Sequence, residues 1–149
     1  MREAIGGTWI FGIVVTFIVL FSSYLAISVN YSKAFKVKND MVSVIEEYEG
    51  YNDNSQQKIE RILSGNGYAV RGPCKSHEQG IDGSAGKYKY CIHCVEKNDS
   101  LKKSYYTVKV FFRLDLPVIG DIFTFPVTGS TKTIHFPTNQ GTGLKCESA

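Results

Sequence analysis

The chain begins with a long apolar run that contains no charged residue. Between Ala4 and Val29 there is no Asp, Glu, Lys, Arg or His, and Glu3 lies directly before this run. As a helix its 26 residues would rise about 39 Å, more than the ~30 Å hydrocarbon core of a bilayer. A signal peptide has a more basic start and a shorter apolar segment, so we predict a transmembrane helix over residues 1–30. Cleavage after Tyr24-Leu25-Ala26 is the alternative.

After the apolar run, hydrophobic positions recur with helical spacing. They form the stripe of an amphipathic helix and are Val37, Met41, Val44, Ile45 and Tyr48. Neither Pro nor Gly occurs between Ile13 and Glu49, so we predict one continuous helix from about Glu3 to about Tyr48, roughly 69 Å long. Residues 31–50 would extend the membrane helix, and Gly50 would end it.

Residues 51–149 have the patterns of a small head. Ser55 is a candidate cap for a short helix whose apolar side carries Ile59, Ile62 and Leu63 and which Gly65-Asn66-Gly67 ends. Alternation with a period of two then predicts strands near residues 88–95, 108–116, 123–127 and 131–136, and a shorter one at 68–70.

The connections between these strands are marked by turn residues. We expect turns at Ile119-Gly120-Asp121 and Thr128-Gly129-Ser130, and a mobile loop from Lys75 to Gly86. The whole predicts an α+β fold, in which a mainly antiparallel sheet of four or five strands packs against the second half of the long N-terminal helix.

Cysteine usage indicates an oxidising compartment. All four cysteines follow the apolar run: Cys74, Cys91, Cys94 and Cys146. An even count in a small head predicts two disulfides, with three possible connectivities. In a strand, side chains three positions apart point to opposite faces, so the Cys91-Ile92-His93-Cys94 motif favours two structural disulfides, one on each face, to Cys74 and Cys146.

Two other interpretations of these cysteines remain. A CxxC pair can form a thiol–disulfide exchange centre, although such pairs usually lie at a helix N-terminus. A zinc site could instead use some of the cysteines together with His77 and His93, but zinc needs four ligands at one point and only one CxxC pair is present.

The charges give a mixed indication of orientation. Lys33, Lys36 and Lys38 follow the apolar run, whereas only Arg2 and the terminal amine precede it. The positive-inside rule alone would place the head in the cytoplasm. The disulfides favour the opposite orientation, so we expect a cytoplasmic N-terminus and an extracytoplasmic head.

Composition excludes several functional classes. The net charge is +3 and the basic residues are scattered, so we expect no nucleic-acid partner. The sequence lacks a phosphate-binding loop, an HExxH motif and an EF-hand loop. We therefore expect a non-enzymatic protein with no catalytic residues, metal or cofactor.

Small residues mark one side of the apolar run. Thr8, Gly12 and Thr16 recur every four residues, and such a stripe allows two membrane helices to approach closely. Glu3, an ionisable group at the edge of the span, is a further functional candidate. We predict these four residues as a subunit-assembly surface for copies of this chain or similar subunits within the lipid bilayer.

In this layout the chain resembles pilin-like proteins, most closely the TadE-like minor pilins of tight-adherence pilus systems. The resemblance rests on Glu3 before the apolar run, the amphipathic extension, the cysteine-bearing strand-rich head and the stretch LPVIGDIFTFPVTGSTKTI. It implies a structural or assembly subunit of a pilus or secretion-type machine, in which Glu3 neutralises a neighbouring subunit's amine.

The resemblance has one departure. Only Met1 and Arg2 precede Glu3, and a prepilin-type cut after Gly6 or Gly7 would remove that glutamate. The chain is therefore expected either to enter a surface filament or to stay in the membrane as an accessory subunit. A monomeric anchored module that binds an extracellular ligand through the Lys75–Gly86 loop is the alternative, followed by a thiol-redox or zinc protein that uses Cys91 and Cys94.

Overall fold

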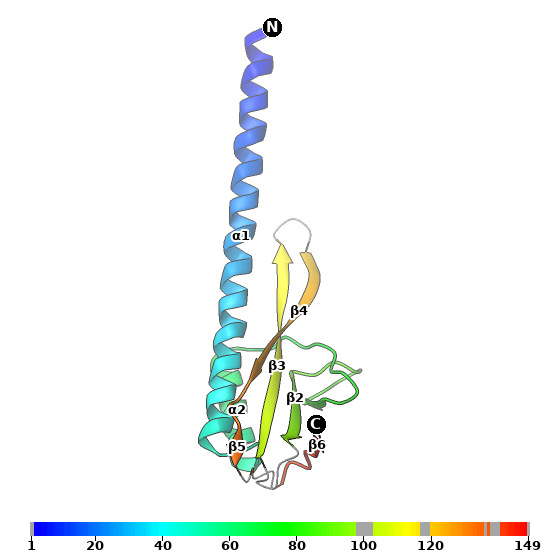
Figure 1. The fold of residues 1–149 in the computed structure, drawn as a ribbon. Coiled ribbons are helices and arrows are strands. Elements are labelled where there is room, and N and C mark those ends of the chain that lie inside the picture. The colour runs from blue at the N-terminus through cyan, green and yellow to red at the C-terminus, as the bar shows by residue number, and fades with distance from the viewer. Residues whose placement is uncertain (1, 98–102, 117–119, 136, 138–140, 149) are drawn as a thin grey trace.

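The fold is taken from a computed structural model, which describes residues 2–97, 103–116, 120–135, 137 and 141–148 of the chain. A long helix runs out of a small head that consists of a second helix and a β-sheet (Figure 1). The fold is therefore α+β, as predicted, with an apolar N-terminal helix and a mainly antiparallel sheet.

Helix α1 spans Arg2–Glu47 without a break, which confirms the predicted continuous helix. It ends in a backbone motif in which the Gly50 N–H donates to the Ile45 carbonyl at 2.9 Å and the Glu49 N–H to the Glu46 carbonyl at 3.3 Å. This is the Schellman arrangement. The left-handed residue is Glu49, with φ of 52°, rather than the predicted terminator Gly50.

The second half of α1 provides one wall of the core. Its buried stripe contains Ala34, Val37, Met41, Val44 and Ile45. Four of these were predicted from the helical spacing; the fifth predicted position, Tyr48, is only partly buried. Tyr51 follows the helix and is fully buried, so the core continues past its end.

Helix α2 spans Asp53–Gly65 and buries Ser55, Ile59 and Leu63. Its cap is Asn52, not Ser55 as predicted. The Asn52 side chain accepts from the Ser55 N–H at 3.0 Å, and the Ser55 hydroxyl accepts from the Asn52 N–H at 2.8 Å. The two residues thus form a reciprocal capping box, in which Ser55 is the third helical residue.

The sheet is built on two central strands. Strand β2 (Tyr90–Lys97) pairs antiparallel with β3 (Lys103–Leu116), β1 (Gln79–Ile81) adds to β2, and β4 (Gly120–Ser130) adds to β3. Two short strands complete it: β5 (Ile134–His135) pairs with β3, and β6 (Cys146–Ser148) pairs parallel with β2.

Several local predictions for the head are wrong. Residues 68–70 are not a strand, Gly120 and Asp121 lie within β4 rather than in a turn, and β4 also continues through Thr128, Gly129 and Ser130. The predicted fourth strand at 131–136 is reduced to the two residues of β5, while Phe136 lies outside the described residues. The Lys75–Gly86 segment, predicted as a mobile loop, contains the short strand β1, which that prediction did not include.

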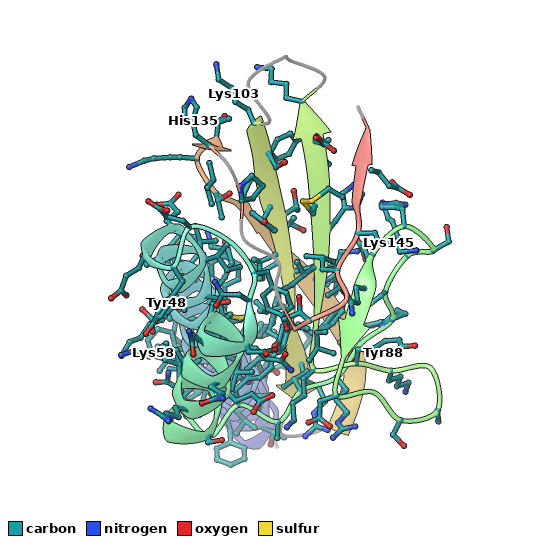
Figure 2. The ribbon with its side chains drawn as sticks, turned by 90° about the horizontal axis from the view of Figure 1, so that it is seen from below. Tyr48, Lys58, Tyr88, Lys103, His135 and Lys145 are labelled. Carbon is teal, nitrogen blue, oxygen red and sulfur yellow. A yellow bond between two sulfur atoms is a disulfide. The ribbon has the colours of Figure 1, made fainter. Side chains whose placement is uncertain are left out.

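The two faces of the sheet are covered differently. Both helices pack on one face, and their side chains fill the space between helix and strand (Figure 2). This inner face carries the alternating positions Tyr90, Ile92, Cys94, Tyr106, Val108 and Val110. The other face carries Cys91, Lys109 and Phe111, and these are also buried. Gly72 lies against Phe111 so closely that a Cβ there would be 2.3 Å from the ring.

Candidate functional site

The first half of α1 is the most exposed apolar surface of the protein. Every residue from Gly6 to Ser22 is exposed, and among them are Trp9, Phe11, Phe17 and Leu20. Among the described residues, one helix is long and apolar enough to cross a membrane, with a mean hydropathy of 2.5 in its most apolar window. It is therefore a candidate single membrane span near the N-terminus.

The predicted small-residue stripe lies on one side of this span. Thr8, Gly12 and Thr16 line a shallow groove, whose rims are Trp9, Ile13, Phe17 and Leu20. The Thr16 hydroxyl donates to the Gly12 carbonyl at 2.8 Å, so its polar group is turned into the helix backbone. A Cβ added at Gly12 would meet nothing within 4 Å.

Glu3 occupies the first turn of α1, but its side chain lies outside the described part of the chain. Its backbone is two turns or more from Gly12 along the same helix, a separation of about 14 Å at 1.5 Å per residue. The four predicted assembly residues are thus on one continuous helix, and the structure places three of their side chains.

All four cysteines are paired in two disulfides, Cys74–Cys91 and Cys94–Cys146. The two thiols of the CxxC motif therefore have different partners on opposite faces of β2, as the strand alternation predicts. The Cys94–Cys146 bridge also lies at the register position where β6 pairs with β2. A redox centre or zinc site made from these cysteines would require breaking the bonds that join the head's segments.

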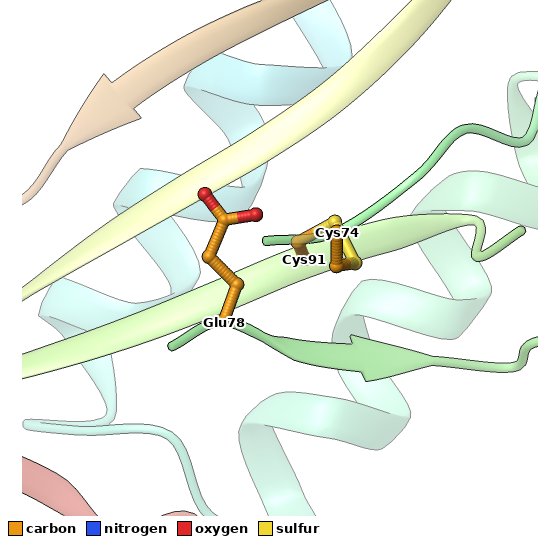
Figure 3. Close-up of side chains that lie close together, drawn as sticks. All are labelled: Cys74, Glu78 and Cys91. Carbon is orange, nitrogen blue, oxygen red and sulfur yellow. A yellow bond between two sulfur atoms is a disulfide. The ribbon is translucent and has the colours of Figure 1, made fainter. Parts of the chain in front are cut away.

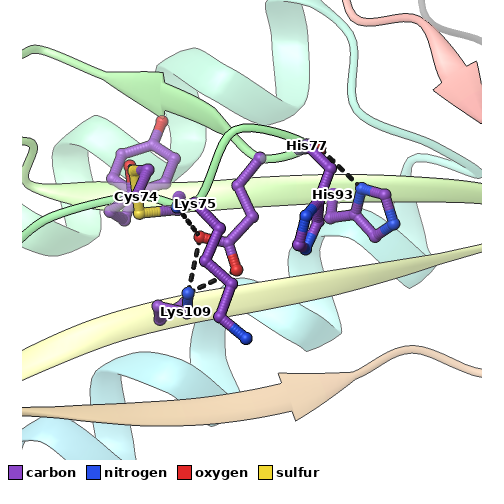
Figure 4. Close-up of polar contacts among 8 residues, drawn as sticks. Cys74, Lys75, His77, His93 and Lys109 are labelled. Atoms are coloured by element: carbon purple, nitrogen blue, oxygen red, sulfur yellow. Dashed lines mark hydrogen bonds and ion pairs between the residues drawn. A yellow bond between two sulfur atoms is a disulfide. The ribbon is translucent and has the colours of Figure 1, made fainter.

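A buried ion pair lies beside the first of these disulfides. The Lys109 ammonium donates to both carboxylate oxygens of Glu78, and the Lys75 N–H donates to Glu78 Oε2 at 2.8 Å (Figure 4). Burial of Glu78 opposes its ionisation, but these hydrogen bonds and the charges of Lys109 and His77 outweigh it. The pKa of Glu78 is consequently lowered from its ordinary value.

This cluster contains residue types that can bind a metal ion, but their ligand atoms are already bonded or paired. Ligand atoms of Cys74, Glu78 and Cys91 lie within 4.8 Å of one another (Figure 3). Both sulfurs are held in the disulfide, and the carboxylate is neutralised by Lys109. A disulfide sulfur is not a thiolate ligand. The arrangement instead joins the chain around Cys74 and Glu78 to strands β2 and β3 of the sheet.

The two histidines of the zinc alternative are neighbours. Their ring centroids are 4.8 Å apart, and His93 Nδ1 lies 2.8 Å from the His77 carbonyl oxygen. His93 Nε2 is 3.9 Å from a carboxylate oxygen of Glu147. The contacts of His93 are thus with a backbone oxygen and an acid of β6, and the cysteine sulfurs are used elsewhere.

Two buried tyrosines, Tyr51 and Tyr90, and the partly buried Tyr68 connect the layers of the head through hydrogen bonds that the sequence did not predict. The Tyr51 and Tyr90 hydroxyls are 3.0 Å apart in the core. The Tyr68 hydroxyl accepts from the Phe111 N–H at 2.7 Å and donates to the Phe111 carbonyl at 2.9 Å. Burial raises the pKa of Tyr51 and of Tyr68 to about 12, and it also raises the pKa of Tyr90.

The Lys75–Gly86 segment, which the alternative function would use to bind a ligand, is attached to the rest of the head at several points. The segment is attached by β1, by the Glu78–Lys109 pair and by contacts of Asp82 with Arg71 and Lys89. Tyr88 packs against Gly80 and Gly83 so closely that a Cβ at either would meet its ring at 2.3 Å. The segment is thus a cover for the outer face of the sheet.

Comparisons with protein-family models, with curated proteins and with solved structures find no match to this chain. Functional assignment therefore depends on the surfaces described above.

Proposed function

We propose that this protein is a pilin-like, single-pass membrane protein that acts as a structural or assembly subunit of a pilus or secretion-type machine, as the TadE-like resemblance implies. The observation that carries the proposal is the unbroken helix α1. Its first half is apolar and exposed on every side, whereas its second half is fixed in a disulfide-linked head.

The exposed half needs a covering environment. An all-round apolar surface of this length is unfavourable in water but suits a bilayer, where the helix satisfies its own backbone hydrogen bonds. Two disulfides in the head favour an oxidising compartment. We therefore place the N-terminus in the cytoplasm and the head outside the membrane.

The groove over Gly12 would be the contact between subunits. In lipid, helices associate through close packing of small residues, because apolar burial gives no advantage over lipid tails. Thr8, Gly12 and Thr16 provide such a surface, and the rim residues around them provide the packing area. Glu3 would pair with the amine of a neighbouring subunit, as the resemblance implies.

Oxidative crosslinking of Gly12→Cys tests this proposal. All four native cysteines are paired, so the new thiol is the free one, and a Cβ added at this position has no other part of the chain within 4 Å beyond its own helix backbone. We expect disulfide-linked dimers in native membranes. The matched control is Val14→Cys, because two residues along a helix turn the side chain to the opposite side at nearly the same depth.

The proposal predicts several-fold more dimer from Gly12→Cys than from Val14→Cys. Equal yields would indicate random collisions in the membrane. The absence of dimers from both variants would indicate a monomeric anchor, and either result would contradict the assembly proposal.

A further inference from the structure

Strands β3 and β4 form a hairpin that extends from the head along α1. In Figure 1 the hairpin runs beside the helix toward its N-terminal half, beyond the rest of the sheet. The Asn30 side-chain amide donates to the Arg113 carbonyl at 3.4 Å, which places Arg113 level with Asn30. Strand β3 continues three residues past this point, to Leu116.

The burial of α1 shows how far the hairpin reaches. Residues 6–22 are exposed without exception, whereas Ser23, Ala26, Ile27 and Asn30 are partly covered. Three strand residues extend about 10 Å, the rise of six or seven helical residues. Counted back from Asn30, that distance ends near Ser23, so strand length and helix exposure agree.

If α1 spans the membrane, the end of the hairpin therefore lies within a few helical residues of the outer boundary of the lipid core. A bilayer core needs about 20 helical residues, and the uncharged run extends from Ala4 to Val29. The outer end of the span must then fall between about Ser23 and Val29. This is the stretch of α1 that the hairpin covers.

Exposed aromatic side chains lie near the head-side end of this stretch. Outside α1, the large hydrophobic side chains that are exposed among the described residues are Phe123, at 60%, and Phe125, at 40%. Both are on β4. Phe123 is the register partner of Leu114, one residue past Arg113, and Phe125 is the partner of Phe112.

These phenylalanines continue an aromatic row that begins on the helix. Tyr31 contacts Phe35 at a ring-centroid distance of 6.2 Å and Phe112 at 5.6 Å. Phe112 stacks on Phe125 at 5.5 Å, and Phe125 contacts Phe123 at 6.0 Å. We call these five residues the aromatic belt. It joins α1 to the exposed aromatic side chains of β4.

Cationic side chains lie next to the belt. A groove beside Phe123 and Thr124 is lined by Arg71, Lys87 and Arg113, and among the residues whose side chains are described no carboxylate lines it. Arg71 also lies 3.9 Å from Asp82. Aromatic residues and cations at one level are typical of the interface between lipid and water, where rings sit among headgroups and cations contact phosphates.

We propose that the β3–β4 hairpin is a second membrane-contacting element, which places Phe123 and Phe125 in the phospholipid headgroup layer and the adjacent cations against lipid phosphates. The inference rests on the proposed membrane insertion of α1 but not on subunit assembly. It implies that the head is held at a fixed height and tilt on the membrane rather than swinging on a single helix.

Depth-dependent quenching of tryptophan fluorescence tests this inference. The full chain is reconstituted in vesicles of equal parts phosphatidylglycerol and phosphatidylcholine, the latter brominated near the headgroup end of its acyl chains. Trp9 is the one native tryptophan and lies within the span, so the wild-type protein reports insertion of α1. A Trp9→Phe background with Phe123→Trp then reports the hairpin.

The matched control is His135→Trp in the same background. His135 is exposed on β5, at the end of the head far from the span (Figure 1). We expect several-fold stronger quenching and a blue-shifted emission for Phe123→Trp than for His135→Trp. Phe125→Trp provides a second reporter, and far-UV circular dichroism shows that each variant is folded.

Quenching of Trp9 without quenching of Phe123→Trp or Phe125→Trp would overturn the hairpin inference and leave the membrane span intact. The absence of quenching at all of these positions would overturn both. Neither result depends on whether subunits associate, so the assembly proposal is tested separately.

Discussion

The two halves of α1 contain similar apolar residues but lie in opposite surroundings. From Gly6 to Ser22 all side chains are exposed, whereas Val37, Met41 and Ile45 are almost fully buried against the sheet. The first half has apolar residues on every side and the second has them on one stripe. One helix can therefore be stabilised by two environments, and the distribution of apolar residues around its axis indicates which environment each half occupies.

The head that holds the second half gains its stability from different sources on its two sides. Helix and sheet meet through apolar packing on the inner face. On the outer face, a disulfide and a buried ion pair attach a segment with little apolar content. If the two halves of α1 are independent, changes in the head should leave the span unaffected.

The largest effect is expected from removing the Cys94–Cys146 disulfide. These cysteines are 52 residues apart, so the bridge restricts a long loop of the unfolded chain, worth about 4 kcal/mol of unfolding free energy. The double variant Cys94→Ser/Cys146→Ser should lower the midpoint of urea unfolding, followed by near-UV circular dichroism in detergent.

The matched control is Cys74→Ser/Cys91→Ser, whose shorter separation of 17 residues predicts a loss of about 3 kcal/mol. Far-UV signal from the detergent-covered span should persist after the head unfolds. Loss of both signals in one transition would show that the two halves of α1 are not independent.

The next largest change in head stability is expected from a substitution in the buried half of α1, compared with one in the exposed half. Ile45→Ala removes a fully buried side chain and should cost the head about 3 kcal/mol, because a cavity replaces its packing contacts. Leu20→Ala, in the exposed half, should leave the midpoint of head unfolding unchanged. A comparable loss for Leu20→Ala would refute the division of the helix.

A smaller effect is expected on the outer face. Glu78→Gln leaves the Lys109 charge buried without its partner and should cost about 2 kcal/mol at neutral pH. Asp82→Asn, on the exposed Asp82–Lys89 pair, should change stability little. Urea unfolding of the two variants beside the wild type distinguishes these expectations.

The stability of the head at acidic pH should also depend on the Glu78–Lys109 pair. Because the pKa of Glu78 is lowered in the folded head, its stabilisation is complete above the ordinary carboxyl pKa and is lost as the pH falls through the folded value. The wild-type head should therefore lose more stability between neutral and acidic pH than Glu78→Gln does. Parallel pH profiles would contradict the role of this pair.

The smallest effect concerns the tyrosine contact inside the core. Tyr51→Phe removes one partner of the Tyr51–Tyr90 hydrogen bond and should cost about 1 kcal/mol. Because the Tyr51 pKa is raised to about 12, wild-type stability is complete below the ordinary pKa of 10.0 and falls as the pH rises toward 12. Tyr51→Phe should weaken this alkaline decline.

Much of the helix was predictable because its information is local. Helical spacing identifies the buried Val37, Met41, Val44 and Ile45, and the absence of Pro and Gly indicates continuity. Strand alternation likewise separates Cys91 from Cys94 and so predicts two disulfides on opposite faces. In each case, the repeat of the secondary structure, about 3.6 residues in a helix or two in a strand, determines the direction of the side chains.

The outer face of the sheet could not be predicted because its contacts join distant segments. Glu78 and Lys109 are 31 positions apart, and both are charged residue types that usually lie on the surface. Tyr68 was predicted to lie in a short strand, but residues 68–70 form none and its hydroxyl bonds to the backbone of Phe111 instead. The position of the β3–β4 hairpin beside α1 also depends on tertiary contacts, which the alternation of residues along a strand does not predict.

The orientation of α1 is tested most directly by labelling with a membrane-impermeant maleimide in intact cells. His135→Cys places a free thiol on the exposed distal end of the head, and Arg2→Cys places one before the span. A membrane-spanning α1 with an extracytoplasmic head predicts labelling of His135→Cys without lysis and of Arg2→Cys after lysis alone. The reverse pattern, or labelling of both in intact cells, would contradict a membrane-spanning α1 with an extracytoplasmic head.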